Sequence, residues 1–142
     1  MKKYLIATTL LLWTSFSQAE NCMPNLIKED VCKAAASLAK EGKHSIPIKV
    51  SENMQITDIK AENNRLIMTA SLSYNSQYLE EAYQHDEKKL EHAKLYGRKH
   101  AKNNACTKKP TRSFINLGGQ IEYDYVFNDG SIYDIVTITS CQ

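Results

Sequence analysis

The stretch from Ile121 to Ile138, IEYDYVFNDGSIYDIVTI, decides the fold. Its centre contains Asp129-Gly130, a dipeptide that favours the two-residue turn of a β-hairpin. If Asn128 pairs with Ser131, three apolar pairs share one face of the two strands: Phe127 with Ile132, Tyr123 with Val136, and Ile121 with Ile138. We therefore predict an antiparallel hairpin close to the C-terminus.

An earlier pair of strands is predicted from the same alternation. Met54–Ala61 and Arg65–Tyr74 flank Glu62-Asn63-Asn64, whose asparagines tolerate the backbone conformations of a turn. Every second residue of the longer strand is apolar (Leu66, Met68, Ala70, Leu72 and Tyr74), so one face of the sheet should be buried. A shorter strand, Ile46–Val50, contains Pro47 and should lie at an edge or a strand start, because proline cannot donate to the ladder.

Two helices complete the predicted architecture. Residues 25–41 carry the apolar stripe Ile27, Val31, Ala34 and Leu38, with Gly42 in the left-handed position after the end. Residues 76–105 form a longer helix capped by Ser76, with an inward stripe of mostly small residues: Leu79, Ala82, Leu90, Ala93, Gly97, Ala101 and Ala105. This stripe indicates either close packing on the sheet or a binding groove. The order predicts an α+β fold, an antiparallel sheet of about five strands with two helices packed on it.

The first nineteen residues have the pattern of a cleaved secretory signal. Lys2 and Lys3 precede the apolar run Leu5–Trp13, and Ser17 and Ala19 place small residues at the cleavage site. The run is too short for a stable membrane anchor. We predict a single periplasmic domain spanning residues 20–142. Cleavage removes two of the 18 basic residues, leaving 16 against 16 acidic ones, and this neutral balance argues against nucleic-acid binding.

All four cysteines, Cys22, Cys32, Cys106 and Cys141, follow the predicted cleavage site. An even number in an exported protein favours two disulfides, for which three pairings are possible. We favour Cys22–Cys32, which would join the chain start to the first helix, and Cys106–Cys141, which would join the last residues to the second helix. A zinc or redox site is the alternative, but the sequence has no Cys-x-x-Cys motif.

No pattern in the sequence indicates catalysis, a metal or a cofactor. His85, His92 and His100 lie seven and eight residues apart, and seven residues span about 10 Å along a helix, too far for two ligands of one ion. Gly118-Gly119 lacks the lysine and helix start of a phosphate loop, and no serine or cysteine stands in a nucleophile elbow. We therefore expect a non-enzymatic binding protein without a cofactor.

Charge is segregated along the chain. Residues 88–112 contain nine basic residues and one acid, Glu91, whereas residues 113–142 contain four acids and no base. A purely structural interpretation is a soluble helix beside an acidic sheet. A functional interpretation is a basic face that binds an acidic partner or anionic lipid. We predict partner-binding residues on that helix (Lys94, Arg98 and Lys102) and on the sheet face opposite the core (Val126, Tyr133 and Ile135). The predicted core contains Leu66, Met68, Leu72, Ile121, Tyr123, Phe127, Ile132, Val136 and Ile138.

The second half of the chain resembles a known family. Cys106, Arg112, Leu117-Gly118, Tyr123, Tyr125, Gly130 and Cys141 form a spaced series similar to that of the AspS-type (GspS-beta) pilotins of type II secretion systems. The resemblance covers roughly residues 54–142. It implies a small periplasmic α+β protein that binds a C-terminal segment of the secretin, with Cys106 and Cys141 as the family's disulfide. Those pilotins are lipoproteins, whereas Ala19-Glu20-Asn21 before Cys22 lacks the context for lipidation.

Two functional hypotheses follow. The first is a pilotin-like adaptor that binds a short segment of a secretion or envelope complex component. The second is a periplasmic inhibitor or immunity protein that blocks a toxin or a cell-wall enzyme. Both roles fit a small, disulfide-stapled, exported protein, and neither assigns the oligomeric state.

The export signal makes a testable prediction. The protein purified from periplasm should begin at or near Glu20, carry no lipid, and contain no free thiol in the absence of reductant. Intact mass spectrometry with and without alkylation measures all three properties. A diacylglycerol adduct on Cys22 would contradict the prediction.

Overall fold

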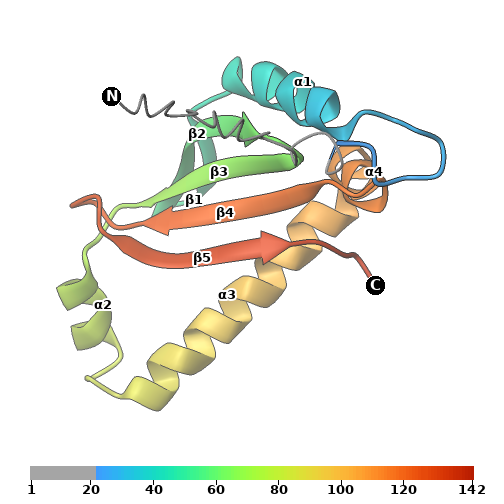
Figure 1. Ribbon diagram of the computed structural model, residues 1–142. Coiled ribbons are helices and arrows are strands. Elements are labelled where there is room, and N and C mark those ends of the chain that lie inside the picture. Colours follow the sequence, from blue (N-terminus) through green and yellow to red (C-terminus); the bar gives the residue numbers. More distant parts are fainter. Residues whose placement is uncertain (1–21) are drawn as a thin grey trace, which may run out of the picture.

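The computed structural model describes residues 22–142, so the predicted signal peptide and its cleavage site lie outside the described residues (Figure 1). The helices are α1 (Val31–Lys43), α2 (Ser76–Ala82), α3 (Glu87–Thr107) and α4 (Lys109–Asn116). The strands are β1 (Ile48–Ser51), β2 (Met54–Glu62), β3 (Arg65–Leu72), β4 (Gln120–Val126) and β5 (Ile132–Ile138). No helix among the described residues is long and apolar enough to cross a membrane. The predicted α+β class is confirmed.

The five strands form one sheet in the order β1-β2-β3-β4-β5, with β1 at an edge as predicted. The sheet is mixed: β3 and β4 are parallel, and the other neighbours are antiparallel. The predicted antiparallel sheet is therefore mostly antiparallel, and the central pair β3–β4 departs from the prediction. The chain leaves β3, runs through α2, α3 and α4, and enters β4 in the same direction, because a long helical connection permits parallel pairing.

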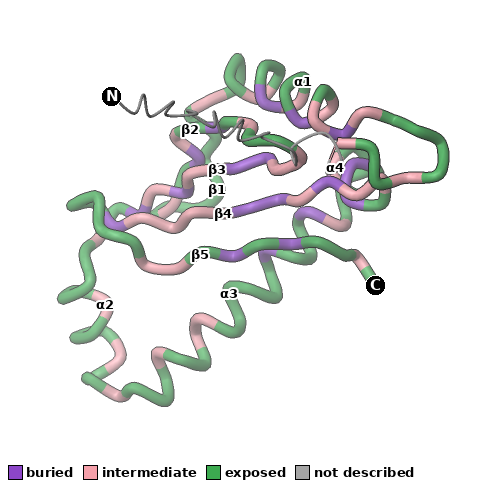
Figure 2. The backbone as a smooth tube through the Cα atoms, viewed as in Figure 1, coloured by how far each residue is buried: buried purple, intermediate pink, exposed green. Residues whose placement is uncertain are grey.

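The core lies on one face of the sheet. The parallel register pairs Leu66 with Ile121 and Met68 with Tyr123, so alternate residues of the two central strands share a side. Ala35 of α1, Ala105 of α3 and other buried helix residues join the same cluster. Figure 1 shows α3 crossing behind β4 and β5. Figure 2 shows that burial is concentrated in the strand centres, α1 and the C-terminal end of α3.

The C-terminal hairpin has the predicted pairs Ile121–Ile138 and Tyr123–Val136, but its turn differs. Gly130 has φ 84°, and Phe127 N donates to Ser131 O at 2.8 Å, which encloses a three-residue loop rather than the expected two. Tyr133 is the extra residue of a β-bulge that restores the register at Tyr125–Asp134. Phe127 therefore does not face Ile132, and Ile132 is 62% exposed instead of belonging to the core. The rest of the predicted core is buried or partly buried.

Helix α1 starts six residues later than predicted. Asp30 accepts hydrogen bonds from the backbone N–H groups of Cys32 and Lys33 and so caps a helix that begins at Val31. Ile27 consequently lies outside the helix and is 70% exposed. Gly42 belongs to the helix and not to its C-cap; a Cβ at this position would lie 2.6 Å from Ile59 Cδ1, so the glycine allows close helix–sheet packing.

The predicted helix over residues 76–105 is two helices. Asn75, not Ser76, caps α2, and Gln84 and His85 both have φ 56°, which interrupts the helix before Asp86 caps α3. The small-residue stripe is buried only at Ala101 and Ala105, and Gly97 is exposed because the first half of α3 extends beyond the sheet. Helix α4 was not predicted, although Pro110 near its start is a recognised helix-initiation signal.

Both favoured disulfides are present, Cys22–Cys32 and Cys106–Cys141. The first joins the segment before α1 to its first turn. The second joins the end of α3 to the residues that follow β5, across a sequence separation of 35. Because β5 is an edge strand with one neighbour in the sheet, this bridge fixes its free end to the helix beneath it.

Three side chains of α3 hold it to β5 and to the residues that follow this strand. Arg98 donates two hydrogen bonds to the Asp134 carboxylate at 2.8 and 2.9 Å, and this ion pair is bidentate. Lys94 Nζ lies 5.1 Å from the ring centre of Tyr133, and Lys102 Nζ donates to the carbonyl oxygen of Gln142 at 2.8 Å. We call these contacts the α3–β5 seam.

The seam predicts a pH-dependent contribution to stability. Hydrogen bonds from Arg98 lower the pKa of Asp134 despite its partial burial. A lowered native pKa stabilises the fold above the unfolded-state value of about 4, and this contribution is lost as the pH falls through the native pKa. Asp134→Asn should therefore reduce the free energy of unfolding at neutral pH by about 1 kcal/mol. The difference from the parent should shrink below about pH 4 in urea denaturation.

The matched control is Glu62→Gln, which removes the Lys60–Glu62 ion pair, whose side chains are 48% and 58% exposed. Its effect should stay within about 0.5 kcal/mol at every pH. An Asp134→Asn effect that does not change with pH would contradict the proposed role of the carboxylate charge.

The second disulfide makes a separate prediction. The double variant Cys106→Ser/Cys141→Ser should be less stable than the parent by about 2–5 kcal/mol, typical for the loss of a bridge in a small secreted domain. The bridge restrains the C-terminal end of β5, so hydrogen exchange should accelerate at Ile138 before it accelerates in β3. Equal acceleration throughout the sheet would contradict this local role.

Candidate functional site

The strongest candidate site is a groove on the helix-bearing face of the sheet, with a volume of about 130 Å³. Its floor is formed by residues of β2, β3 and β4, and its two walls are β1 and the C-terminal part of α3. Most of its lining is apolar, and the lining residues are Ile48, Val50, Met54, Ile56, Met68, Ala70, Ala101, Asn104, Lys108, Tyr123 and Tyr125. We call this feature the sheet groove.

The groove exists because the helices leave part of the sheet floor between them. Helix α1 packs on β2 and β3, whereas α3 packs on β5. The parallel register places Met68 beside Tyr123 and Ala70 beside Tyr125 in the interval between these helices. Ala101 of α3 has no side chain beyond Cβ, so it does not fill the space between the helix and the sheet floor.

The wall formed by β1 is unusual because its apolar residues are accessible. Ile48 and Val50 are 38% and 44% exposed, and both line the groove. A four-residue strand with one neighbour in the sheet presents both a row of apolar side chains and an unpaired backbone edge. The groove therefore offers apolar contact area to another molecule.

The tyrosines give the groove a polar component. The rings of Tyr123 and Tyr125 stack with their centres 6.2 Å apart. Burial raises the pKa of both hydroxyls, that of Tyr125 to about 12, so both are neutral donors over the physiological range. Exposed Asn104 of α3 supplies an amide, and exposed Lys108, between α3 and α4, supplies a positive charge. The arrangement suits an apolar segment with a few polar or acidic groups, and it places no nucleophile beside a base.

The three basic residues predicted to bind a partner, Lys94, Arg98 and Lys102, lie in the α3–β5 seam. Their charged groups contact Tyr133, Asp134 and the Gln142 carbonyl of the same chain. These basic residues therefore contact groups of the same chain, which agrees with the interpretation of a soluble helix beside an acidic sheet. Partner binding by these residues stays a prediction.

The structure separates the three sheet residues predicted to form an apolar strip. Val126 is half-buried and Ile135 is 48% exposed on the face opposite the core. The bulge instead turns Tyr133 toward the helix, where its ring lies 5.3 Å from that of Phe127 and beneath Lys94. Burial raises the pKa of Tyr133 to about 12.

The face opposite the core is polar at its centre. Arg65 Nη1 donates to Glu122 Oε2 at 2.9 Å, and Thr137 Oγ1 donates to the same oxygen at 3.1 Å. Beside them, Asp124 Oδ1 is buried without a hydrogen-bond partner among the described residues. Burial, followed by the nearby charge of Glu122, raises the pKa of Asp124. This polar centre interrupts the apolar strip expected on that face.

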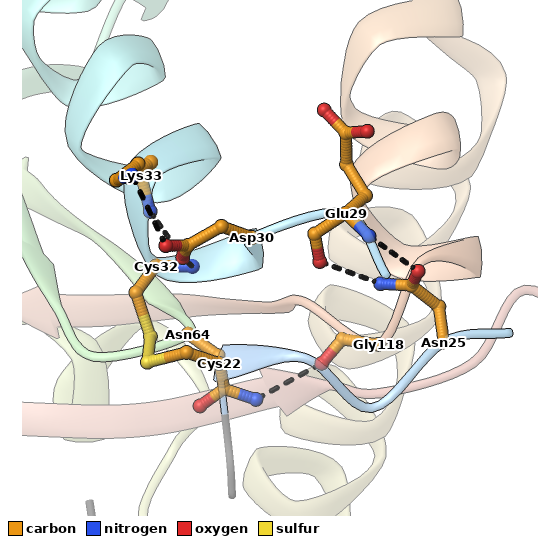
Figure 3. Close-up of a disulfide and its surroundings, with 8 residues drawn as sticks. All are labelled: Cys22, Asn25, Glu29, Asp30, Cys32, Lys33, Asn64 and Gly118. Atoms are coloured by element: carbon orange, nitrogen blue, oxygen red, sulfur yellow. Dashed lines mark hydrogen bonds and ion pairs between the residues drawn. A yellow bond between two sulfur atoms is a disulfide. The ribbon is translucent and has the colours of Figure 1, made fainter. Parts of the chain in front are cut away.

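Figure 3 shows the surroundings of the Cys22–Cys32 disulfide. Asn25 accepts from Glu29 N and donates to the Glu29 and Leu117 carbonyl oxygens, so it ties this segment to the end of α4. Within residues 22–142, only Cys22, Asp30 and Cys32 place three potential metal ligands within 4.8 Å of one another. Both sulfur atoms belong to the disulfide, so neither is a thiolate that could coordinate an ion.

Sequence reasoning missed the β1 wall of the groove and its boundary at Lys108. Tyr123 is part of the predicted core. Tyr125 faces Asp134 and so interrupts the run of apolar hairpin pairs, a signal that this end of the strand is not fully covered. The alternation of Ile48 and Val50 on an edge strand was a second signal. Neither signal was enough to locate the groove, because its floor depends on the parallel pairing of β3 with β4, which was not predicted.

No protein-family model matches the sequence, and no curated protein sequence matches it. The fold, however, is similar to those of several solved structures. The type II secretion system pilotin AspS of Vibrio cholerae superposes with a TM-score of 0.54 at 13% identity, covering 77% of this chain and 88% of that one. The type 2 secretion system pilotin EpsS of Vibrio vulnificus gives 0.57 at 15% identity, covering 79% and 92%.

A third similar structure is that of PA3611, a candidate secreted protein of Pseudomonas aeruginosa. It superposes with a TM-score of 0.62 at 16% identity, covering 79% of this chain and 93% of that one. The agreement spans most of each protein. The chain has a pilotin-like fold.

Proposed function

We propose that this protein is a non-enzymatic adaptor that binds a short segment of a secretion or envelope complex component in the sheet groove. The observation that carries the proposal is the accessible apolar floor and β1 wall on a fold similar to two type II secretion pilotins. The partner we propose is a C-terminal segment of a secretin, and we place the protein in the periplasm.

The geometry supports a peptide segment rather than a small polar ligand. Apolar side chains line the groove on three sides, and their burial under a partner would be favourable at roughly 25 cal/mol per Å² of apolar area. The two tyrosine hydroxyls and Asn104 can hydrogen-bond to polar groups of the segment. Lys108 favours an acidic residue near the groove's end. An amphipathic helix or an extended strand added to β1 would meet these requirements.

The groove and the opposite sheet face can be tested against each other. Val50→Asp adds a charge to the groove, and Ile135→Asp adds the same charge to the opposite face, where the exposure of the parent side chain is nearly equal (44% and 48%). Fluorescence anisotropy would measure binding of a labelled peptide with the C-terminal sequence of the type II secretin from the same cell. Val50→Asp should weaken binding at least tenfold, because the charge would have to be desolvated.

Ile135→Asp should bind like the parent, and both variants should melt within a few degrees of it because both sites are exposed. Undiminished binding by Val50→Asp would exclude the groove, and loss of binding only in Ile135→Asp would place the interface on the opposite face. Failure of the parent to bind the peptide would contradict the secretin adaptor role itself.

A further inference from the structure

We propose that a second, uncharged hollow at the α2 end of the sheet binds a neutral saccharide. The hollow has a volume of about 370 Å³ and is lined by Asn53, Ser73, Tyr74, Asn75, Tyr78 and Asn128. It shares no lining residue with the sheet groove. This inference is therefore independent of the adaptor proposal.

Each of the three asparagines is oriented by a hydrogen bond at one end of its amide. Asn53 Oδ1 accepts from Ser73 Oγ at 3.0 Å, and Asn75 Oδ1 accepts from Tyr78 N at 2.9 Å. Asn128 Nδ2 donates to Ser73 O at 3.2 Å. Among the described residues, the other end of each amide has no hydrogen-bond partner, which leaves the NH2 groups of Asn53 and Asn75 and the amide oxygen of Asn128 available at the hollow.

An aromatic platform stands beside these amides. Tyr78 is 59% exposed, and its ring centre lies 5.5 Å from that of Tyr74. Tyr74 packs in turn on Phe127, and Phe127 packs on Tyr133 in the α3–β5 seam. The exposed ring is thus supported by a continuous series of aromatic contacts, so a ligand would meet it already in place.

Backbone hydrogen bonds join the three segments that form the hollow. Ser73 N donates to Asn53 O at 3.0 Å, which connects β3 to the β1–β2 turn. Asn128 N donates to Tyr74 O at 3.1 Å, which connects the β4–β5 turn to the residues before α2. The hollow is therefore part of the folded sheet and not a space between independent loops.

These features match the chemistry of a sugar. A pyranose ring has an apolar C–H face that packs on an aromatic ring and an edge of hydroxyl groups that pair with amides. None of the six lining residues is charged, which favours a neutral ligand. Another hollow of about 370 Å³ adjoins this one and shares Asn53 and Ser73 with it. Its other lining residues are the polar Ser51, Gln55 and Ser71, the oppositely charged pair Lys49 and Glu52, and the apolar Met54 and Leu72. The combined length favours an oligosaccharide over a single sugar.

The test is a titration of the ¹⁵N-labelled protein with two neutral oligosaccharides at millimolar concentration, one of β-1,4-linked N-acetylglucosamine and one of α-1,4-linked glucose. The side-chain amide signals of Asn53, Asn75 and Asn128 should shift with at least one of them. The oligosaccharide that binds identifies the class of glycan. Absence of a shift with both would overturn the proposal.

Tyr78→Ala should weaken binding about fivefold to tenfold by removing the exposed stacking face. The matched control is Tyr96→Ala, because Tyr96 is 62% exposed on α3 and does not line the hollow. Asn53→Asp retains the oxygen that accepts from Ser73 but loses the free donor, so it should also weaken binding. Equal affinity of Tyr78→Ala and Tyr96→Ala would overturn the site even if the parent binds a glycan.

Discussion

The parallel pairing of β3 with β4 is the constraint on which the rest of the structure depends. Parallel neighbours cannot be joined by a tight turn, so residues 73–119 must return from one end of the sheet to the other. Helix α3 makes this return across the core face, and α4 turns the chain back into β4. The crossover also fixes the floor of the sheet groove, because the register of β3 and β4 places Met68 beside Tyr123 and Ala70 beside Tyr125.

The crossover helix is held by charge as much as by apolar packing. Only Ala101 and Ala105 of α3 are fully buried, and both lie near its C-terminal end. Closer to the N-terminus of the helix, Arg98 and Lys94 contact Asp134 and Tyr133, and at its C-terminal end Cys106 is bonded to Cys141. A helix with so little buried surface needs these contacts to define its angle across the sheet. The basic character of residues 88–112 therefore has a structural role before any partner is considered.

Sequence patterns predicted the local elements better than their arrangement. The pairs Tyr123–Val136 and Ile121–Ile138 follow from alternation across a hairpin, and the two disulfides follow from which segments the cysteines flank. The bulge at Tyr133 could not be predicted, because a three-residue loop and a compensating bulge give the same distant register as a two-residue loop. Because Tyr133 is the bulged residue, its side chain lies in the α3–β5 seam and not in the predicted surface strip.

The interrupted helix illustrates a different limit. The apolar periodicity from Leu79 to Ala105 continues through Gln84 and His85, yet both of these residues have φ 56°. The local signal for the break was Asp86 followed by Glu87, since Asp is a good N-cap and an acidic residue at the first helical position favours a helix start. Periodicity indicates which residues could share a helix face, whereas capping determines where a helix can begin. In this segment the cap at Asp86 sets the start of α3, although the periodicity would allow one continuous helix.

Strand β1 shows how a short edge strand can serve two surfaces of different chemistry. Ile48 and Val50 line the sheet groove, whereas Lys49 and Ser51 line the polar hollow that adjoins the tyrosine platform. The register with β2 shifts between Lys49 and Ser51, so these four residues give each surface two contacts without following a regular strand alternation. Since β1 pairs only with β2, its position depends on that one ladder, and the geometry of both surfaces depends on the same hydrogen bonds.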